Sequence, residues 1–254
     1  MRRWTSLRGG GREVKEKPIL FSTPMVQGLL NTKPGTWPPE PIDPRKPCKG
    51  MTRRVVKHYG RTPEQCGRDK FYKHVNELNG KQGLHAGFYK DSDVFMYEGK
   101  QLIDAIYFKS RYQPGDVIYV QETWKCTSFS DKTHALAIRF ETGGQTEAWF
   151  DSKERYEKFK KFYFKNGWQS PYFMPKEAAR LFLVVKDVRV ERLQEISEED
   201  AKAEGVIPHP IPGRGFVNGH RNSFERLWDS INGKKHPWES NPYVWVISFE
   251  RRVE

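Results

Sequence analysis

The sequence has few cysteines, and their spacing argues against two common kinds of site. Its 254 residues include three cysteines, Cys48, Cys66 and Cys126, and no Cys-x-x-Cys pair. Three cysteines cannot all pair within one chain, so we expect a reducing, intracellular compartment. A zinc site built from Cys48, His58, Cys66 and His74 would fit no standard zinc-finger spacing. We expect no metal and no cofactor.

Long apolar runs are absent, and hydrophobic residues in general are scarce. No stretch approaches the roughly 20 consecutive apolar residues that cross a membrane, and residues 1–12 have no apolar core after their arginines. We therefore expect neither a membrane span nor a secretory signal. Hydrophobic residues make up 36% of the chain and the mean hydropathy is -0.82. Because a chain of this length can bury a real core, we interpret these low values as long polar insertions on a modest core.

Acidic residues are few near the start of the chain. The formal net charge is +12, and residues 1–60 hold 13 Lys and Arg against 4 Asp and Glu, a difference of +9. Nucleic acid is the natural partner for such an asymmetry. The alternative is a soluble basic protein with a solvated tail, because charge alone does not define a binding site.

The first fifty residues predict a basic arm, two short elements and a loop. Residues 1–17 are glycine-rich and basic, which is typical of a flexible interaction arm. Residues 18–30 predict a strand and then a helix that starts at a hydroxyl cap and a proline. Six prolines within residues 31–47 exclude a helix there and favour an extended loop leading to Lys49.

The remainder predicts more strands than helices. Helices are expected over residues 151–165, 197–205 and 223–231. Strands are expected at 55–56, 117–124, 134–140, 180–193 and 243–249, with a turn at 113–116 and a turn or bulge at 186–187. This order favours an α+β fold with a curled mixed sheet or a small β-barrel. We expect one domain over residues 18–254, with insertions at about 60–110 and 126–167.

The helix expected over residues 151–165 combines aromatic rings with basic side chains. Tyr156, Phe159, Phe162 and Tyr163 recur at helical spacing among five lysines and one arginine. Such a helix can stack bases and neutralise phosphates. It can also turn its rings to the core and its lysines to water, and the sequence leaves both interpretations open.

The densest group of chemically active side chains is Lys49-Gly50-Met51-Thr52-Arg53-Arg54. An amine, a hydroxyl and two guanidiniums can bind phosphate or take part in catalysis. Lys49 and Thr52 lie three positions apart, which is one turn of a helix or opposite faces of a strand. The local loop therefore decides whether these two side chains meet.

The order of short motifs resembles the ASCH domain family. The motifs are Met25-Val26, Lys49-x-x-Thr52-Arg53-Arg54, Pro114-Gly115-Asp116-Val117, Glu122-Thr123-Trp124, Met174-Pro175 through Arg180, Ile196 to Gly205, and Trp228 before the last strand. They cover residues 18–59, 111–125 and 168–252, and the chain is most similar to larger members associated with phage and prophage genomes. The resemblance implies a PUA-like fold, a small β-barrel with flanking helices. It also implies binding of RNA or modified nucleotides, in the cytoplasm of a bacterium or a phage-infected host cell.

The resemblance further implies which residues form the site. Some small bacterial relatives are amidohydrolases that remove the acetyl group from acetylated cytidine with a lysine, a threonine and a glutamate, which match Lys49, Thr52 and Glu204. The usual Gly-Arg/Lys-Lys-Thr run is replaced here by Pro47-Cys48-Lys49-Gly50. Thr52 attacks only if a base removes its proton, and Lys49 can act as that base only when neutral. In the alternative interpretation Lys49 contacts phosphate, Thr52 is a strand residue and Glu204 is a solvated helix residue.

Three functions remain open at this point. The first is recognition of RNA, or of a modified nucleoside or nucleotide, in a basic cleft lined by Lys49, Thr52, Arg53, Arg54, Trp124 and Glu204. The second is an amidohydrolase acting on acylated cytidine, and the third is a metal-independent ribonuclease in which Lys49 and the arginines stabilise a phosphorane. Trp124 also fits a core position, and Arg180 fits either a phosphate ligand or the partner of an acid.

Overall fold

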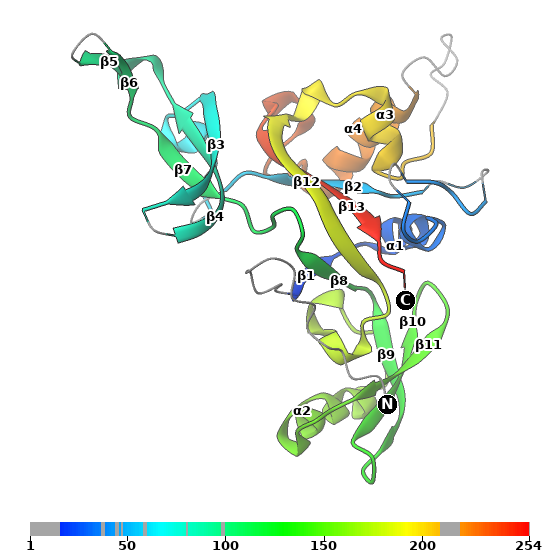
Figure 1. Cartoon of the computed structure of the whole chain (residues 1–254). Coiled ribbons are helices and arrows are strands. Elements are labelled where there is room, and N and C mark those ends of the chain that lie inside the picture. The colour runs from blue at the N-terminus through cyan, green and yellow to red at the C-terminus, as the bar shows by residue number, and fades with distance from the viewer. Residues whose placement is uncertain are drawn as a thin grey trace. The chain divides into compact units, whose positions relative to one another are not determined.

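The chain folds into two compact units, each built from separate segments (Figure 1). The computed structural model describes residues 16–253 except 37–38, 44–45, 47, 58–59, 80, 98–99 and 209–218. The first unit holds residues 1–50, 115–184 and 250–254, and the second holds residues 51–114 and 185–249. Residues 1–15 of the predicted arm lie outside the described residues. No helix in the described part of the chain is long and apolar enough to cross a membrane.

The first unit contains a parallel strand pair and a short helix. β1 (Glu16–Leu20) pairs in parallel with β8 (Val117–Gln121), and the start of β12 (Phe182–Arg192) pairs with β8 in antiparallel register. Helix α1 (Thr23–Leu30) begins after Ser22 and has a proline in its first turn. Its apolar residues are spaced so that one face is buried. The strand and the helix predicted for this segment are both confirmed.

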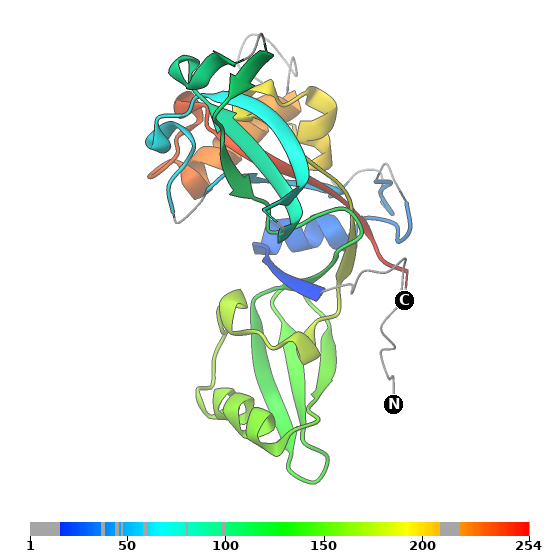
Figure 2. The ribbon, with the colours of Figure 1, turned by 60° about the vertical axis from the view of Figure 1, so that its left-hand side comes forward.

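The first unit also contains a three-stranded antiparallel sheet covered by a helix. The sheet has the order β11 (Gln145–Trp149), β10 (Ala135–Phe140), β9 (Trp124–Ser130), and Figure 2 shows α2 (Lys153–Phe164) beside it. The Ser152 hydroxyl accepts a hydrogen bond from the backbone N–H of Arg155, as expected for a helix cap. Short 3-10 turns follow at Pro171–Phe173 and Lys176–Ala178. Trp124, Leu136, Ile138, Phe140 and Tyr156 are among the buried residues of this core.

The second unit is organised around β2 (Met51–Val55) and β13 (Tyr243–Arg251), which pair in antiparallel register. By hydrogen bonding, the strands of the largest sheet have the order β1-β8-β12-β13-β2. Strand β12 continues through residues 186–187 without a turn, although both of these residues are exposed and the alternation of buried positions shifts there. Of the turn or bulge predicted there, the turn is wrong, and the shift in side-chain alternation is of the kind that a bulge produces.

Residues 60–110, whose apolar residues follow no clear period in the sequence, fold mainly as strands of the second unit. A three-stranded sheet has the order β3 (Lys70–Leu78), β4 (Lys81–Tyr89), β7 (Ile106–Lys109), and a separate hairpin joins β5 (Val94–Tyr97) to β6 (Lys100–Ile103). Short 3-10 turns lie at Glu64–Cys66 and Asp91–Asp93. Asn79 adopts a positive φ of 51° between β3 and β4. An Asn-Gly pair is the strongest short-range hairpin signal, and Asn79-Gly80 is the signal that could have located this hairpin.

Two helices cover one face of β2 and β13 in the second unit. They are α3 (Glu198–Ala203) and α4 (Gly219–Asn232), with 3-10 turns at Leu193–Glu195 and Trp238–Ser240. The Glu198 carboxylate accepts hydrogen bonds from the backbone N–H groups of His220 and Arg221, at 2.7 and 3.0 Å, and so links α3 to the first turn of α4. The core below them includes Met51, Leu193, Ile196, Ala201, Phe224, Trp228, Val244 and Val246.

The fold class is α+β, as predicted, with curled mixed sheets. The largest sheet has two edge strands, β1 and β2, in the described part of the chain. It is therefore an open sheet and not a closed barrel, so of the two architectures expected from the sequence the curled sheet is the one found. The sheet is open because β1 and β2 do not pair with each other, and a barrel closes only when its two edge strands pair.

Candidate functional site

Strand β2 presents its side chains to two different faces of the second unit. Successive residues of a strand point to opposite sides, so Met51 and Arg53 share one face and Thr52 and Arg54 share the other. The contact of 3.5 Å between Arg53 Nη1 and Met51 Sδ agrees with this alternation. The basic cluster seen in the sequence is therefore divided by the strand that carries it.

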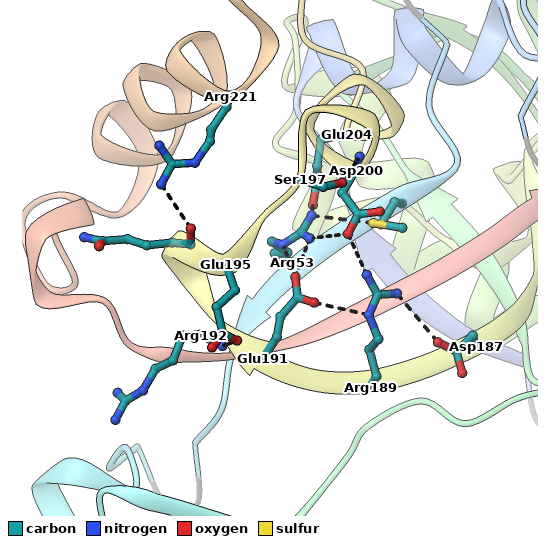
Figure 3. Close-up of polar contacts among 12 residues, drawn as sticks. Arg53, Asp187, Arg189, Glu191, Arg192, Glu195, Ser197, Asp200, Glu204 and Arg221 are labelled. Atoms are coloured by element: carbon teal, nitrogen blue, oxygen red, sulfur yellow. Dashed lines mark hydrogen bonds and ion pairs between the residues drawn. The ribbon is translucent and has the colours of Figure 1, made fainter. Parts of the chain in front are cut away.

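Arg53 lies inside a cluster of carboxylates (Figure 3). Its Nη2 is 2.5 Å from Glu191 Oε1 and 2.8 Å from Asp200 Oδ2, and its Nη1 is 3.2 Å from Glu204 Oε1. The Arg53 side chain is 0% exposed, and that of Glu204 is 2% exposed. The guanidinium thus donates its hydrogen bonds to carboxylates of the protein, and a phosphate would bind it only by displacing one of these carboxylates.

A second arginine completes the cluster from the side of β12. Arg189 Nη2 is 2.6 Å from Asp200 Oδ2, and Arg189 Nε is 3.2 Å from Glu191 Oε2. Arg189 Nη1 lies 3.7 Å from Asp187 Oδ2. Two of the carboxylates therefore bridge Arg53 and Arg189, and Figure 3 shows both guanidiniums directed at them. Such shared charge-assisted contacts fix the geometry of the whole group.

Local sequence explains why the two acids of α3 reach the same arginine. The Ser197 hydroxyl accepts a hydrogen bond from the Asp200 N–H at 3.0 Å and starts the helix. Asp200 and Glu204 are four positions apart and so lie on one helix face. Gly205, with φ of +82°, ends the helix as the sequence predicted.

The carboxylates change the protonation behaviour of the arginines on β2. Burial alone would lower the pKa of Arg53, but the negative charges of Glu204, Glu191 and Asp200 outweigh it and raise that pKa. For Arg54 burial dominates and lowers the pKa, although Glu204 again acts in the opposite direction. Arg53 is therefore held firmly in its charged form, and Arg54 is the less strongly stabilised cation of the two.

Thr52 is buried, at 1% exposure, on the face opposite Arg53. It pairs with Ile247 of β13, and that face of β13 also carries Trp245. The His74 ring stacks on Trp245 with 6.0 Å between ring centroids, and burial lowers the pKa of His74 so that the ring is neutral near pH 7. Within the described residues no hydrogen bond joins the Thr52 hydroxyl to Glu204.

Lys49 is a buried lysine of the first unit, at 1% exposure. The Thr32 hydroxyl accepts a hydrogen bond from the Lys49 N–H at 2.9 Å and lies 2.9 Å from Gly28 O. A Cβ added to Gly28 would lie 3.3 Å from Lys49 Cβ, so the small residue on α1 allows the close approach. The Lys49 ammonium lies 5.5 Å from the centroid of the Phe21 ring. The lysine is thus held from both its backbone and its side chain.

Trp124 and Arg180 occupy structural positions within the first unit. Trp124 is fully buried and packs against Phe162 with 5.2 Å between ring centroids, so its ring is not at the surface for a base to stack on. Arg180 binds Glu122 through two hydrogen bonds of 2.8 and 2.7 Å. Its guanidinium also lies 4.0 Å from the Phe140 ring centroid. Of the alternatives left open by the sequence, the core position of Trp124 and the acid partner of Arg180 match these contacts.

Sequence reasoning identified Arg53 and Glu204 but missed the residues that join them. Glu191, Asp200 and Arg189 were not predicted as site residues. The spacing of Asp200 and Glu204 on a capped helix was a usable signal, because i and i+4 carboxylates share a face. The alternation of Arg189 and Glu191 on a strand was a second one.

The comparisons with known proteins leave the family open: no protein-family model, no curated protein and no solved structure matches the chain.

Proposed function

We propose that this protein recognises RNA or a modified nucleoside in an ASCH-like domain of the PUA-like type. Lys49 of the first unit and Thr52 and Glu204 of the second are each a candidate contact. The observation that carries the proposal is their burial, at 1%, 1% and 3% exposure. These three residues were selected from motif order alone, without reference to exposure. A resemblance by chance would have no reason to select polar residues that are all buried.

Buried polar side chains of this kind need a reason to be there. Lysine and glutamate are almost never fully buried unless paired, because desolvation disfavours their charged forms. Lys49 is the one lysine among the buried polar residues that the structure describes. Desolvated titratable groups gather at functional sites, which supports a recognition role for these positions.

A direct test measures binding of cytidine and acetylated cytidine, as nucleosides and within a short RNA, by isothermal titration calorimetry. We expect Lys49→Met to weaken binding by at least about tenfold, because one charge-assisted contact is worth about 1.5–3 kcal/mol. The matched control is Lys46→Met, since the Lys46 side chain on the same loop is 70% exposed and pairs only loosely with Asp43. Equal affinity in wild type and Lys49→Met, or no binding by the wild type, overturns the proposal.

A second candidate function is an amidohydrolase, favoured by the burial of Thr52. The Thr52 hydroxyl oxygen would attack the acetyl carbon of acetylated cytidine while a neutral base takes its proton. The bond from that carbon to the cytosine amine nitrogen would break as that base returns the proton to the nitrogen. Water would then release acetate from Thr52. The ribonuclease hypothesis gains no support, because the Arg53 guanidinium it requires is enclosed by carboxylates.

Acetate release from acetylated cytidine separates hydrolysis from binding. We expect Thr52→Ala to abolish release and Thr52→Ser, which keeps a hydroxyl, to retain a measurable part of it. Release at the uncatalysed rate by the wild type, together with tight nucleoside binding, rejects the amidohydrolase and leaves the binding function standing. Equal release by wild type and Thr52→Ala removes Thr52 as the nucleophile.

A further inference from the structure

A second surface, far from Lys49 in sequence and within the first unit, has its own chemistry. Between residues 151 and 173 all the apolar side chains except Pro171 are aromatic, and the segment contains no Ala, Val, Leu, Ile or Met. A helix that only needed to cover the β9–β11 sheet would use aliphatic residues as well, because they pack a core with less loss of helix propensity. The restriction to rings points to a use for the rings themselves.

Only part of this aromatic set enters the core. Tyr156 and Phe162 are buried against the β9–β11 sheet. Phe159 is partly buried against the same core. The five exposed rings form what we call the aromatic surface, at 37%, 68%, 47%, 71% and 50% exposure: Tyr163, Phe164, Trp168, Tyr172 and Phe173. Single exposed apolar residues are ordinary on a protein surface, but five large rings within eleven positions of sequence are not.

Four rings of the aromatic surface form two pairs, each with a further aromatic contact. Tyr163 and Phe164 lie 5.3 Å apart between centroids, and both contact Phe129 of β9, at 5.0 and 5.9 Å. Tyr172 and Phe173 lie 5.3 Å apart, and Phe173 reaches the buried Phe162 at 6.0 Å. The chain after α2 thus returns to the same helix, because Phe162 is a residue of α2.

A backbone anchor holds the loop that carries the remaining ring. Gln169 donates its N–H to Trp124 O at 2.7 Å and accepts from the Trp124 N–H at 3.3 Å, which fastens the loop to β9. Next to that anchor, the Lys125 ammonium lies 5.0 Å from the centroid of the Trp168 ring. Trp168 is therefore presented from a fixed loop, with a cation on one side.

The charged side chains of the segment that carries the aromatic surface are of one sign. Residues 158–176 include five lysines and no acidic residue. Lys160 pairs with Asp131, and Lys176 pairs with Glu16. No carboxylate in the described part of the chain forms an ion pair with Lys158, Lys161 or Lys165, and all three are exposed. These three ammonium groups are available to neutralise an anionic partner.

We propose that the aromatic surface binds single-stranded nucleic acid, with bases stacked on the rings and phosphates near the lysines. Non-sequence-specific binding of single strands uses this combination, because every base has a stackable face and every nucleotide has one negative charge. Proteins that lie on membranes present leucine together with phenylalanine and tryptophan, and aliphatic residues are missing here. Lysine is depleted in protein interfaces, which disfavours a protein partner. The proposal does not depend on the site around Lys49.

The test is fluorescence anisotropy with labelled single-stranded RNA, with single-stranded DNA of the same sequence, and with the corresponding duplex. We expect Trp168→Ala and Tyr172→Ala each to weaken single-strand binding by about 5- to 100-fold, the range found for loss of one stacked base. The double change Lys161→Gln and Lys165→Gln should lower the slope of log affinity against log salt by about 0.7 per lysine. Single-stranded RNA and DNA should bind alike, and the duplex more weakly. Duplex affinity equal to that of the single strand overturns stacking.

Trp149→Ala is the matched control, because Trp149 is 55% exposed in the same unit but lies between Glu147 and Asp151. It should bind like wild type, and all variants should keep the wild-type melting temperature because the changed side chains are exposed. Binding unchanged in Trp168→Ala and Tyr172→Ala, or reduced equally in Trp149→Ala, overturns the proposal. Wild type that binds vesicles of phosphatidylserine and phosphatidylcholine but no single strand assigns the surface to lipid instead. If Trp168→Ala keeps wild-type RNA affinity and Lys49→Met loses nucleoside binding, only the proposed function is supported. If Trp168→Ala loses RNA affinity and Lys49→Met keeps nucleoside binding, only this inference is supported.

Discussion

Replacing Arg53 with methionine should destabilise the second unit through charge and not through volume. The Arg53 side chain is 0% exposed and meets Glu204, Glu191 and Asp200, which are 2%, 15% and 23% exposed. Methionine fills most of the same space but offers no donor, so three acids lose their common cation. Breaking a buried ion pair by removing one partner destabilises by about 3–5 kcal/mol.

The structure places the Arg53→Met effect at the lower end of that range. Glu191 and Asp200 keep contacts with Arg189 and are partly solvated, so the loss is largest at Glu204, whose side chain is 2% exposed. We expect a decrease of about 3 kcal/mol in the free energy of unfolding at pH 7. Urea denaturation followed by tryptophan fluorescence measures it, with Trp228, Trp238 and Trp245 as probes in the second unit. Arg189→Met is the control and should lose less than about 1 kcal/mol, since its side chain is 36% exposed.

The pH dependence tests the reason for the Arg53→Met effect. A buried carboxylate without its cation has a folded-state pKa raised above its unfolded value, so its stabilisation is present at low pH and is lost as pH rises through the folded-state pKa. The deficit of Arg53→Met relative to wild type should therefore shrink between pH 7 and about pH 4. A deficit below about 1 kcal/mol at pH 7, or one that does not change with pH, refutes the electrostatic account.

Two further changes probe the packing of the first unit. In Gly50→Ala the added Cβ would lie 2.6 Å from Pro39 Cγ, part of a rigid ring, so we expect a loss of about 1–3 kcal/mol on urea denaturation. Gly167→Ala, whose added Cβ would meet nothing closer than 3.9 Å, should stay near wild type, and equal losses in both would contradict the contact. Burial raises the pKa of the Cys126 thiol to about 11, so at pH 8 it stays protonated. Iodoacetamide mapping by mass spectrometry should label the more exposed Cys66 first. Faster labelling of Cys126 than of Cys66 would contradict the burial of the Cys126 thiol.

The parts of the fold that the sequence predicted are those with local causes. Helix α3 was predicted because Ser197 and Gly205 mark its two ends within the chain itself. Helix α2 was predicted from a cap at Asp151 or Ser152 and from aromatic residues at helical spacing. The strongest strand, β12, was found from its alternating apolar residues, although its side-chain shift at residues 186–187 was also read as a possible turn.

The parts that were missed depend on partners distant in sequence. The carboxylates around Arg53 come from positions 191, 200 and 204, which no local pattern connects to position 53. A guanidinium on a strand looks the same in sequence whether it meets phosphate or three acids. Residues 60–110 lacked a clear period because both faces of β3 and β4 carry aromatic and polar residues together.

The segments of the two units alternate along the chain, which restricts how the protein can fold during synthesis and how it can be cut into fragments. The chain passes from one unit to the other after residues 50, 114, 184 and 249. In the first unit Gly35 N–H donates to Arg251 O at 2.7 Å. This hydrogen bond can form only after a residue more than two hundred positions later has been synthesised. Neither unit is complete on the ribosome until about residue 249 has been synthesised. The two units therefore cannot fold one after the other during translation. No single cut produces either unit as one continuous fragment, and deletions from either end first remove residues of the first unit.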